Sequence, residues 1–314
     1  MHDDPITLRQ LQALLAISDS GSIGAAARRL NVTQPVLSRI VAQLERSAGV
    51  SLLARGPRGT VLTPSGKLLA ARARTISAEL KRCEEDLQLM RGDTGGLISV
   101  AASPVPMMLV VPFAIRQLLQ TLPDAEVLVN EIVYPQLLDA FRDQRIDFAI
   151  GPVPASGLGV DFRVEHLFQV DGVIAVARDH PKATVRSLEA LRAEPWIIMG
   201  PTNGPGAVVS QLFASYGIEP PRCKVTLDTV WSAIEMISQT RFVGWVPKPI
   251  AESALDRVRT VKIREALPPL QIGLITRTDT QLTTAARALI SAVRVRSRQL
   301  QRADHALGNR PQDQ

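Results

Sequence analysis

The pattern of apolar and polar positions changes once along the chain, near residue 97. Before that point, apolar residues recur every three to four positions, which predicts short amphipathic helices. The first stripe begins at Leu8, and Ser22 is the expected N-cap of a helix over 23–30. A turn over 31–33 then leads into a third helix that Thr33 can cap. Two such helices joined by three or four residues predict a helix-turn-helix.

A β wing and one long helix are expected next. The segment SLLARGPRGTVLTPSG at 51–66 predicts two short strands around a Gly-Pro-Arg-Gly turn. In the helix expected over 64–91, apolar positions alternate in steps of four and three, the heptad pattern of a helix that pairs with another. The seam consists of Leu69, Ala73, Ile76, Leu80, Cys83 and Leu87. We therefore expect dimerisation through this helix, with packing on its own domain as the alternative.

Beyond residue 97, short apolar runs alternate with helical stretches. This texture predicts parallel sheets covered by helices on both faces. Two sets of strands and helices indicate two α/β lobes, lobe I over about 97–167 and 269–301 and lobe II over about 168–268. The expected domains are therefore a winged helix-turn-helix domain (1–65), a linker helix (66–91), a two-lobed domain (92–301, with a final helix over 281–301) and a disordered tail (302–314).

Charge is concentrated near the start of the chain. The whole sequence has a formal net charge of +6. Between Ser20 and Ala78 there are nine Lys and Arg residues and one acid, Glu45, so this window carries +8 and the remainder −2. A localised basic region is typical of a polyanion-binding surface, although a merely basic solvated face is the alternative.

Several function classes lack their sequence features. The chain contains no GxxxxGK[ST], GxSxG, HExxH or CxxC motif, and its four histidines are scattered. We therefore expect neither an enzyme, nor a metal site, nor a cofactor. The apolar runs are too short to span a bilayer. The N-terminal MHDDPITL lacks the features of a signal peptide, and the two cysteines are far apart, so we expect a cytoplasmic location without membrane association.

The third helix has a face suited to double-stranded DNA. Its apolar stripe leaves an opposite face without a carboxylate that would repel phosphate. Gln34 and Arg39 offer paired donors for base edges, and Pro35 suits a thymine methyl group. Wing arginines would contact the flanking backbone or minor groove. The predicted DNA-binding residues are Ser22, Thr33, Gln34, Pro35, Ser38, Arg39, Arg55 and Arg58.

From Leu8 to Leu69 the sequence resembles the winged helix-turn-helix of LysR-type transcriptional regulators. The resemblance lies in the spacing of GS…AA..L, QP.LS..I..LE, GV.L and LTP.G, and DQRIDFAIG at 143–151 resembles a turn-strand signature of the same family. Leu14 and Leu53 replace phenylalanine, and Gln144 replaces a common glycine. The resemblance implies a two-lobed, periplasmic-binding-protein-like effector domain. It also implies dimers at a dyad-symmetric promoter site, assembly into tetramers, and RNA polymerase as a further partner.

The resemblance also implies a small-molecule effector between the lobes. Matching positions are Ser103, Pro104, Val105, Tyr134, Pro135, Gly151, Pro201, Thr202, Asn203, Trp245 and Pro247. A hydroxyl beside a helix N-terminus suits an anion, and the aromatic neighbours suit a ring. AASP at 101–104 and GPGA at 204–207 are also similar to regulators of bacterial toluenesulfonate degradation, which implies an aromatic carboxylate or sulfonate. The alternative function is a solute-binding protein with a basic N-terminal extension.

Overall fold

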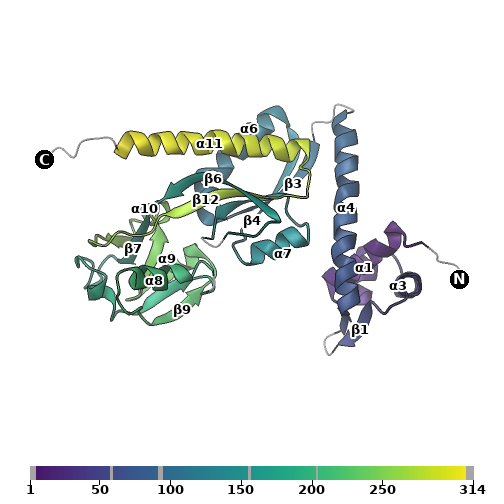
Figure 1. Ribbon diagram of the computed structural model, residues 1–314, viewed down its shortest axis with the longest axis horizontal. Helices are drawn as coiled ribbons and strands as arrows, with labels where there is room; N and C mark the ends of the chain where they lie inside the picture. The colour runs from purple at the N-terminus through teal and green to yellow at the C-terminus, as the bar shows by residue number, and fades with distance from the viewer. Residues whose placement is uncertain (1–4, 57–58, 91–94, 155–156, 203, 309–314) are drawn as a thin grey trace. The chain divides into compact units, whose positions relative to one another are not determined.

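The computed structural model describes residues 5–56, 59–90, 95–154, 157–202 and 204–308 (Figure 1). The chain divides into two compact units. One comprises residues 1–93 with 142–145, and the other comprises 94–141 with 146–314.

The N-terminal unit contains the predicted helix-turn-helix, wing and long helix. Strands β1 and β2 pair antiparallel, as expected for a wing. The elements are α1 (Leu8–Ser20), α2 (Ile23–Arg29), α3 (Gln34–Ala48), β1 (Leu53–Gly56), β2 (Gly59–Leu62) and α4 (Pro64–Met90). Leu14 is buried and Leu53 is partly buried in the apolar interior of this unit. The two leucines that stand in place of phenylalanine are therefore packing residues.

Side chains at the helix starts explain most of these boundaries. Thr7 and Gln10 form a reciprocal capping box at the start of α1. The Ser22 hydroxyl accepts a hydrogen bond from the Ala25 amide at 3.2 Å, as a Ser N-cap does. Thr33 occupies the N-cap position of α3, but its side chain makes no capping hydrogen bond. The predicted N-cap position of Thr33 is therefore confirmed, while the start of α3 lacks a side-chain capping bond from it.

The LTPSG segment joins the wing to α4. The Thr63 hydroxyl accepts from the Gly66 amide at 3.0 Å and donates to the Ser51 carbonyl at 2.7 Å. Gly66 is needed for close approach, because a β-carbon there would lie 2.0 Å from the Leu52 carbonyl oxygen. These contacts fix where the long helix starts relative to the wing.

Lobe I of the second unit is built on a five-stranded sheet of order β4-β3-β5-β12-β6. Its strands are β3 (Gly95–Ala102), β4 (Asp124–Asn130), β5 (Phe148–Pro152), β6 (Phe162–Val170) and β12 (Leu270–Arg277). Its helices are α5 (Pro104–Leu109), α6 (Val111–Thr121), α7 (Gln136–Arg142) and α11 (Thr284–Gly308). In the turn before β5, Gln144 adopts φ of +51°, the left-handed conformation that a glycine would take more easily.

Lobe II has a second five-stranded sheet, of order β11-β7-β10-β8-β9. Its strands are β7 (Gly172–Ala177), β8 (Trp196–Met199), β9 (Cys223–Leu227), β10 (Val243–Pro247) and β11 (Val258–Val261). Its helices are α8 (Ala207–Ser215), α9 (Val230–Gln239), α10 (Lys248–Glu252) and the short 3-10 helix η1 (Glu189–Leu191). The two-lobed α/β architecture is confirmed.

Three details of the predicted fold are corrected. Both sheets are mixed, because β12 pairs antiparallel with β5 and β6, and β7 pairs antiparallel with β10 and β11. The boundary expected between 167 and 168 falls inside β6, which continues to Val170 before the chain enters lobe II. The disordered tail expected from residue 302 is helical as far as Gly308; residues 309–314 lie outside the described part of the chain.

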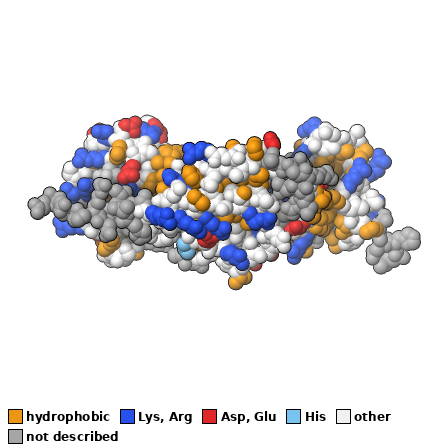
Figure 2. All heavy atoms as spheres, turned by 90° about the horizontal axis from the view of Figure 1, so that it is seen from above, with side chains coloured by type: hydrophobic (Ala, Val, Ile, Leu, Met, Phe, Trp, Pro, Cys, Tyr) orange, Lys and Arg blue, Asp and Glu red, His pale blue; other side chains and the backbone are white. Residues whose placement is uncertain are grey.

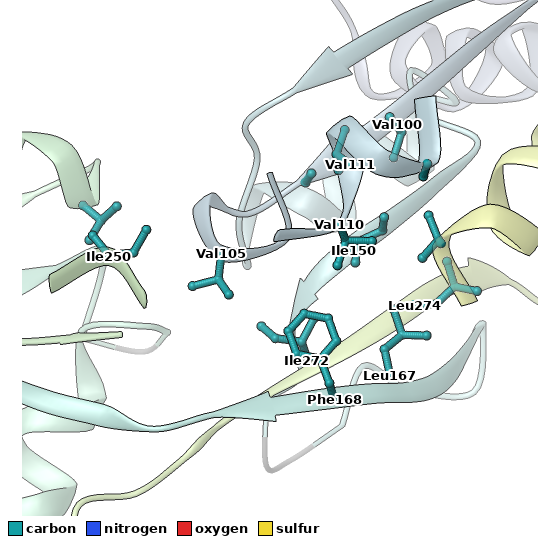
Figure 3. Close-up of a cluster of buried hydrophobic side chains, with 14 of the residues drawn as sticks. Val100, Val105, Val110, Val111, Ile150, Leu167, Phe168, Ile250, Ile272 and Leu274 are labelled. Atoms are coloured by element: carbon teal, nitrogen blue, oxygen red, sulfur yellow. The ribbon is translucent and has the colours of Figure 1, made fainter. Parts of the chain in front are cut away.

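Apolar side chains from both lobes form one buried cluster. Figure 3 shows Val105 of α5 and Ile250 of α10 in this cluster, with Phe168 and Ile272 from lobe I strands.

Figure 2 views the α11 side, where Lys and Arg side chains gather over the effector unit. None of the helices in the described part of the chain combines the length and apolarity that a membrane span requires.

Candidate DNA-binding surface and effector site

The exposed face of α3 consists of the side chains predicted to contact DNA. Leu37, Val41 and Leu44 are buried against the other helices, which fixes the rotation of α3. The opposite face therefore projects into solvent. Its residues are Gln34, Pro35, Ser38 and Arg39, preceded by exposed Thr33. Among the described residues no carboxylate lies within ion-pair distance of Arg39, so its guanidinium remains available for a base or phosphate.

Gln34 lies beside the start of α2. A β-carbon on Gly24 would be 3.6 Å from the Gln34 side-chain oxygen and 4.0 Å from an Arg28 guanidinium nitrogen. The turn of the motif thus brings Gln34, Arg28 and the α2 N-terminus at Ser22 to one surface. Arg28 was not predicted as a site residue, although its place in the acid-poor window was an available signal.

The one acid of the basic window, Glu45, is engaged inside the domain. Its carboxylate accepts hydrogen bonds from the backbone amides of Leu52, at 2.7 Å, and Leu53, at 3.1 Å. These amides begin the first wing strand. Glu45 therefore holds the wing to α3 instead of presenting its charge on the exposed face, a role that the sequence pattern did not reveal.

The wing arginines are only partly placed. The backbone of Arg55 belongs to β1. The Arg55 side chain and all of Arg58 lie outside the described part of the structure. Nearby, Arg29 is paired with Asp19 at 3.2 Å. On α2 and α3, Arg28, Arg39 and Arg46 are without such a partner among the described residues.

The predicted seam on α4 divides into two parts. Leu69 is partly buried and Ala73 is fully buried within their own domain, so Ala73 is not available to a partner helix, and that part of the prediction is wrong. The C-terminal half of the seam is exposed: Ile76 (49%), Leu80 (39%), Cys83 and Leu87 (54%). An apolar stripe at helical spacing therefore has no cover in the described part of this chain.

Ser103 and Gly151 lie together at the ends of β3 and β5. The Ser103 amide donates to the Ile150 carbonyl at 3.0 Å, and a β-carbon on Gly151 would lie 3.4 Å from the Ser103 hydroxyl oxygen. Ser103 is only 2% exposed, and its hydroxyl has no hydrogen-bond partner among the described residues. Pro104 then opens α5, as predicted. A buried hydroxyl without a partner is uncommon in a folded protein and is a natural ligand contact.

The Tyr134 and Pro201 segments of the two lobes meet at Gly204. A β-carbon on Gly204 would lie 3.3 Å from the Tyr134 carbonyl oxygen and 3.4 Å from the Pro201 ring. Thr202 is exposed nearby in sequence, and Pro135 is partly buried beside Tyr134. Asn203, also predicted here, lies outside the described residues.

Three other predicted effector residues belong to the apolar interior. Val105 is 2% exposed within the cluster that spans the lobes (Figure 3). Trp245 is packed in the lobe II core, where a β-carbon on Gly172 would lie 2.2 Å from its indole nitrogen, and Pro247 is buried at the end of the same strand. All three side chains are packed in the interior, so their contact with a ligand stays a prediction.

A cavity of about 830 Å³ lies elsewhere in the same unit. Its walls come from the loop after β5, from β6, from α8 and from the chain segment that returns to lobe I, including Val153, His166, Gln211, Leu212 and Leu270. None of the ten predicted effector positions that the structure describes lines it. The sequence offered little signal for this cavity, because its walls come from separate strands, loops and a helix flank that no common motif marks.

Metal chemistry finds no support in these surfaces. Within the described ranges, no group of three or more His, Cys, Asp and Glu residues is arranged to hold a metal ion.

Two family models match the sequence. Residues 8–67 match the model described as bacterial regulatory helix-turn-helix protein, lysR family, and residues 91–298 match the LysR substrate binding domain. The second match alone spans more than half of the chain.

Named relatives and solved structures agree with these matches. The transcriptional regulator TdcA of Escherichia coli is 27% identical over 289 residues, which cover 91% of this chain and 92% of TdcA. TfdS of Cupriavidus pinatubonensis is 27% identical over 91% of this chain and 97% of its own length. The structure of CbnR, a LysR family transcriptional regulator, aligns with a TM-score of 0.69 and 24% identity over 93% of this chain and 99% of CbnR. CbnR complexed with its target DNA aligns at 0.68, with 25% identity over 93% of this chain and all of that one.

Proposed function

The chain belongs to the LysR family of transcriptional regulators, and from this premise we propose which of its surfaces bind DNA, a second copy and the effector. In this proposal α3 enters the major groove of a dyad-symmetric promoter site. Gln34 and Arg39 read base edges, Pro35 contacts a methyl group, and Ser22, Thr33 and Ser38 bind phosphate or base. Arg55 and Arg58 on the wing contact the flanking backbone.

One observation carries the DNA-binding assignment most directly. The buried stripe of α3 fixes its rotation so that the face without a carboxylate is outermost, and Glu45 is withdrawn from that face by its bonds to the wing. A DNA phosphate therefore meets no repelling charge from this helix. The CbnR structure that holds its target DNA supports the same use of the corresponding module.

A gel-shift assay of the full chain on the upstream region of its own gene tests this assignment. Arg39→Ala should weaken binding to the cognate fragment by about 1–3 kcal/mol and relax sequence preference, if Arg39 reads a base. The matched control is Arg46→Ala, which removes an exposed arginine from the last turn of the same helix. Equal weakening on all fragments would assign Arg39 to phosphate. No binding by the unaltered chain at low salt would overturn the assignment.

We further propose that two copies pair through the exposed part of the α4 seam, residues Ile76, Leu80, Cys83 and Leu87. These apolar side chains recur in steps of four, three and four, and burying them against a second helix would remove them from water. Each dimer then presents two α3 helices to the two half-sites. Pairs of dimers form the tetramer that the family pattern implies.

For the effector, we propose that the buried Ser103 hydroxyl donates a hydrogen bond to a small anion bound between the lobes, an aromatic carboxylate or sulfonate. The support is that this hydroxyl is buried beside Gly151 without a partner among the described residues. The Tyr134 carbonyl of lobe I lies close to Gly204 in the Pro201 segment of lobe II. A ligand there changes DNA binding only if its affinity differs between two lobe arrangements.

Thermal-shift measurements with benzoate and p-toluenesulfonate test the effector site. Ser103→Ala should abolish a stabilisation that the unaltered chain shows, while DNA affinity without ligand is retained. Ser99→Ala, at a half-buried position on the strand that leads to Ser103, is the control and should keep the response. An unchanged response in Ser103→Ala would remove this serine from the site.

The solute-binding alternative is not favoured, because it leaves the helix-turn-helix without a role. We propose that the protein acts in the cytoplasm by binding, with RNA polymerase as a further partner, and that it catalyses no reaction. A purified chain that retains its ligand response but binds none of its upstream DNA would restore the alternative.

A further inference from the structure

A basic hollow lies at the outer edge of lobe II, away from the residues discussed so far. It has a volume of about 450 Å³ and is formed by the end of β7, the loop that follows it and the edge strand β11. Four cationic side chains line it, with two threonines: Arg178, Arg186, Arg259, Lys262, Thr184 and Thr260. None of these residues belongs to the predicted effector positions or to the cavity of about 830 Å³.

The hollow is held in shape by backbone pairing and by its own arginines. Strands β7 and β11 pair antiparallel, with Ala177 opposite Val258, so Arg178 follows directly beside the start of β11. The Arg178 guanidinium donates to the Leu255 carbonyl at 2.8 Å, and that of Arg186 donates to the Lys262 carbonyl at 3.4 Å. Each bond connects two segments and uses one donor. The other donors of both guanidiniums remain for a ligand.

The charges around the hollow are not compensated. No acidic residue lines it, and among the described residues none of the four cations has a carboxylate within ion-pair distance. Asp256, which is close in sequence, lies 3.9 Å from Arg257. Other arginines of the same lobe are paired: Arg257 with Glu235 at 3.2 Å, and Arg192 with Glu189 at 3.9 Å. Like charges gathered without counter-charges repel one another, and a bound anion relieves that repulsion.

We propose that this hollow binds the phosphate group of a small molecule, either inorganic phosphate or a phosphate ester. Arginine presents a planar fork that matches phosphate oxygens, and threonine hydroxyls add neutral donors. A doubly charged tetrahedral anion with several acceptor oxygens uses several cations at once, which a single carboxylate does not. Its concave form, with Ala183 and Leu255 in the wall, favours a small ligand over the surface of a DNA duplex.

A competing explanation is that the cations protect an exposed strand edge. β11 is the last strand of its sheet, and charged side chains on edge strands prevent pairing with other chains. That role predicts no response to phosphate beyond the response to salt. The two explanations therefore differ in a measurement on the full chain.

The test measures the melting temperature of the full chain in sodium phosphate and in sodium chloride of equal ionic strength. Phosphate should raise the melting temperature by about 2 °C or more beyond chloride, because a ligand that binds only the folded state stabilises it. The double variant Arg186→Gln/Arg259→Gln should lose this excess. The matched control, Arg222→Gln/Lys224→Gln, removes two charges at the opposite edge of the same sheet and should keep it.

Each other outcome overturns the proposal. If phosphate raises the melting temperature equally in Arg186→Gln/Arg259→Gln and in the control double variant, the stabilisation by anions is non-specific. If phosphate raises the melting temperature of the unaltered chain no more than chloride does, the cations protect the strand edge. A third outcome is that phosphate has no effect and that Arg186→Gln/Arg259→Gln, but not the control double variant, loses DNA affinity in a gel-shift. In that case the cations contact DNA. Circular dichroism checks folding, and the single variant Lys262→Gln replaces the double variant if that chain does not fold.

Discussion

The carboxylate of Glu45 provides a sharp test of how the DNA-binding unit is held together. In Glu45→Ala, the backbone amides of Leu52 and Leu53 lose their acceptor. A hydrogen bond to a charged group contributes roughly 1.5–3 kcal/mol, and an unsatisfied buried amide costs a similar amount. Leu52 is 1% exposed, whereas Leu53 and Glu45 are half-buried, so water replaces part of the loss. We expect the N-terminal unit to be destabilised by about 2–4 kcal/mol.

Urea unfolding of the full chain, followed with amide hydrogen exchange at Leu52 and Leu53, measures this effect. The two amides should exchange faster in Glu45→Ala, and the unfolding transition of the N-terminal unit should shift to lower urea. Glu45→Gln keeps an acceptor oxygen but not the charge, so its loss should be smaller. Glu84→Ala, at an exposed position of α4, is the control and should leave both amides protected.

The same variant has a functional consequence. Arg55 follows two residues after Leu53, so a loosened wing should weaken DNA binding through the flanking backbone contacts. Preference among sequences should be retained, because the exposed face of α3 with Gln34 and Arg39 is unchanged. Unchanged protection of both amides in Glu45→Ala would refute the reasoning, since it would mean that neither amide depends on this carboxylate.

Three other changes test separate parts of the molecule. Leu80→Asp should convert the oligomer to monomers by light scattering, because a charge would be buried in the α4 pairing surface; an unchanged mass would place the interface elsewhere. Gly66→Ala should destabilise the N-terminal unit by about 1–3 kcal/mol in urea, because the new β-carbon would press on the Leu52 carbonyl. Arg277 lowers the pKa of Asp279 to about 2. The folded-state pKa is depressed, so this pair should stabilise the chain above pH 4 and lose its effect as pH falls toward 2. Asp279→Asn should therefore be less stable by under about 1 kcal/mol at pH 6 and equal at pH 2, since the carboxyl is largely exposed.

The helix-turn-helix was predictable because its signals are local. The spacing of Leu37, Val41 and Leu44 fixes which face of α3 is buried, and the structure agrees. The LTPSG segment was recognised as a motif, but the sequence did not show why it ends in glycine. Gly66 lies against the Leu52 carbonyl, a contact between residues fourteen positions apart. Spacing within a helix is readable from a sequence, whereas approach between elements depends on the assembled fold.

The effector positions illustrate the limit of matching by strand ends. Ser103 and Gly151 do meet, because parallel neighbours in one sheet end at the same edge. Trp245 does not line an open wall, since every residue of β10 is buried and its side chains alternate between two cores. A fully apolar strand carries no alternation from which the facing of one residue could be deduced. The antiparallel pairing of β12 and β7 depends on contacts between distant segments, which no local pattern in either strand encodes.

The acid-poor window in the sequence predicted the basic surface, but the charge count did not show where its one acid, Glu45, lies. Glu45 is the single acid between Ser20 and Ala78. A glutamate on the exposed face of α3 would repel DNA phosphate. The structure removes that objection, because both bonds of the carboxylate go inward to the wing. The acid thus places the basic wing beside α3 while leaving the exposed face of α3 without negative charge. The electrostatic surface and the stability of the DNA-binding unit therefore depend on the same side chain, and a change at Glu45 should alter both.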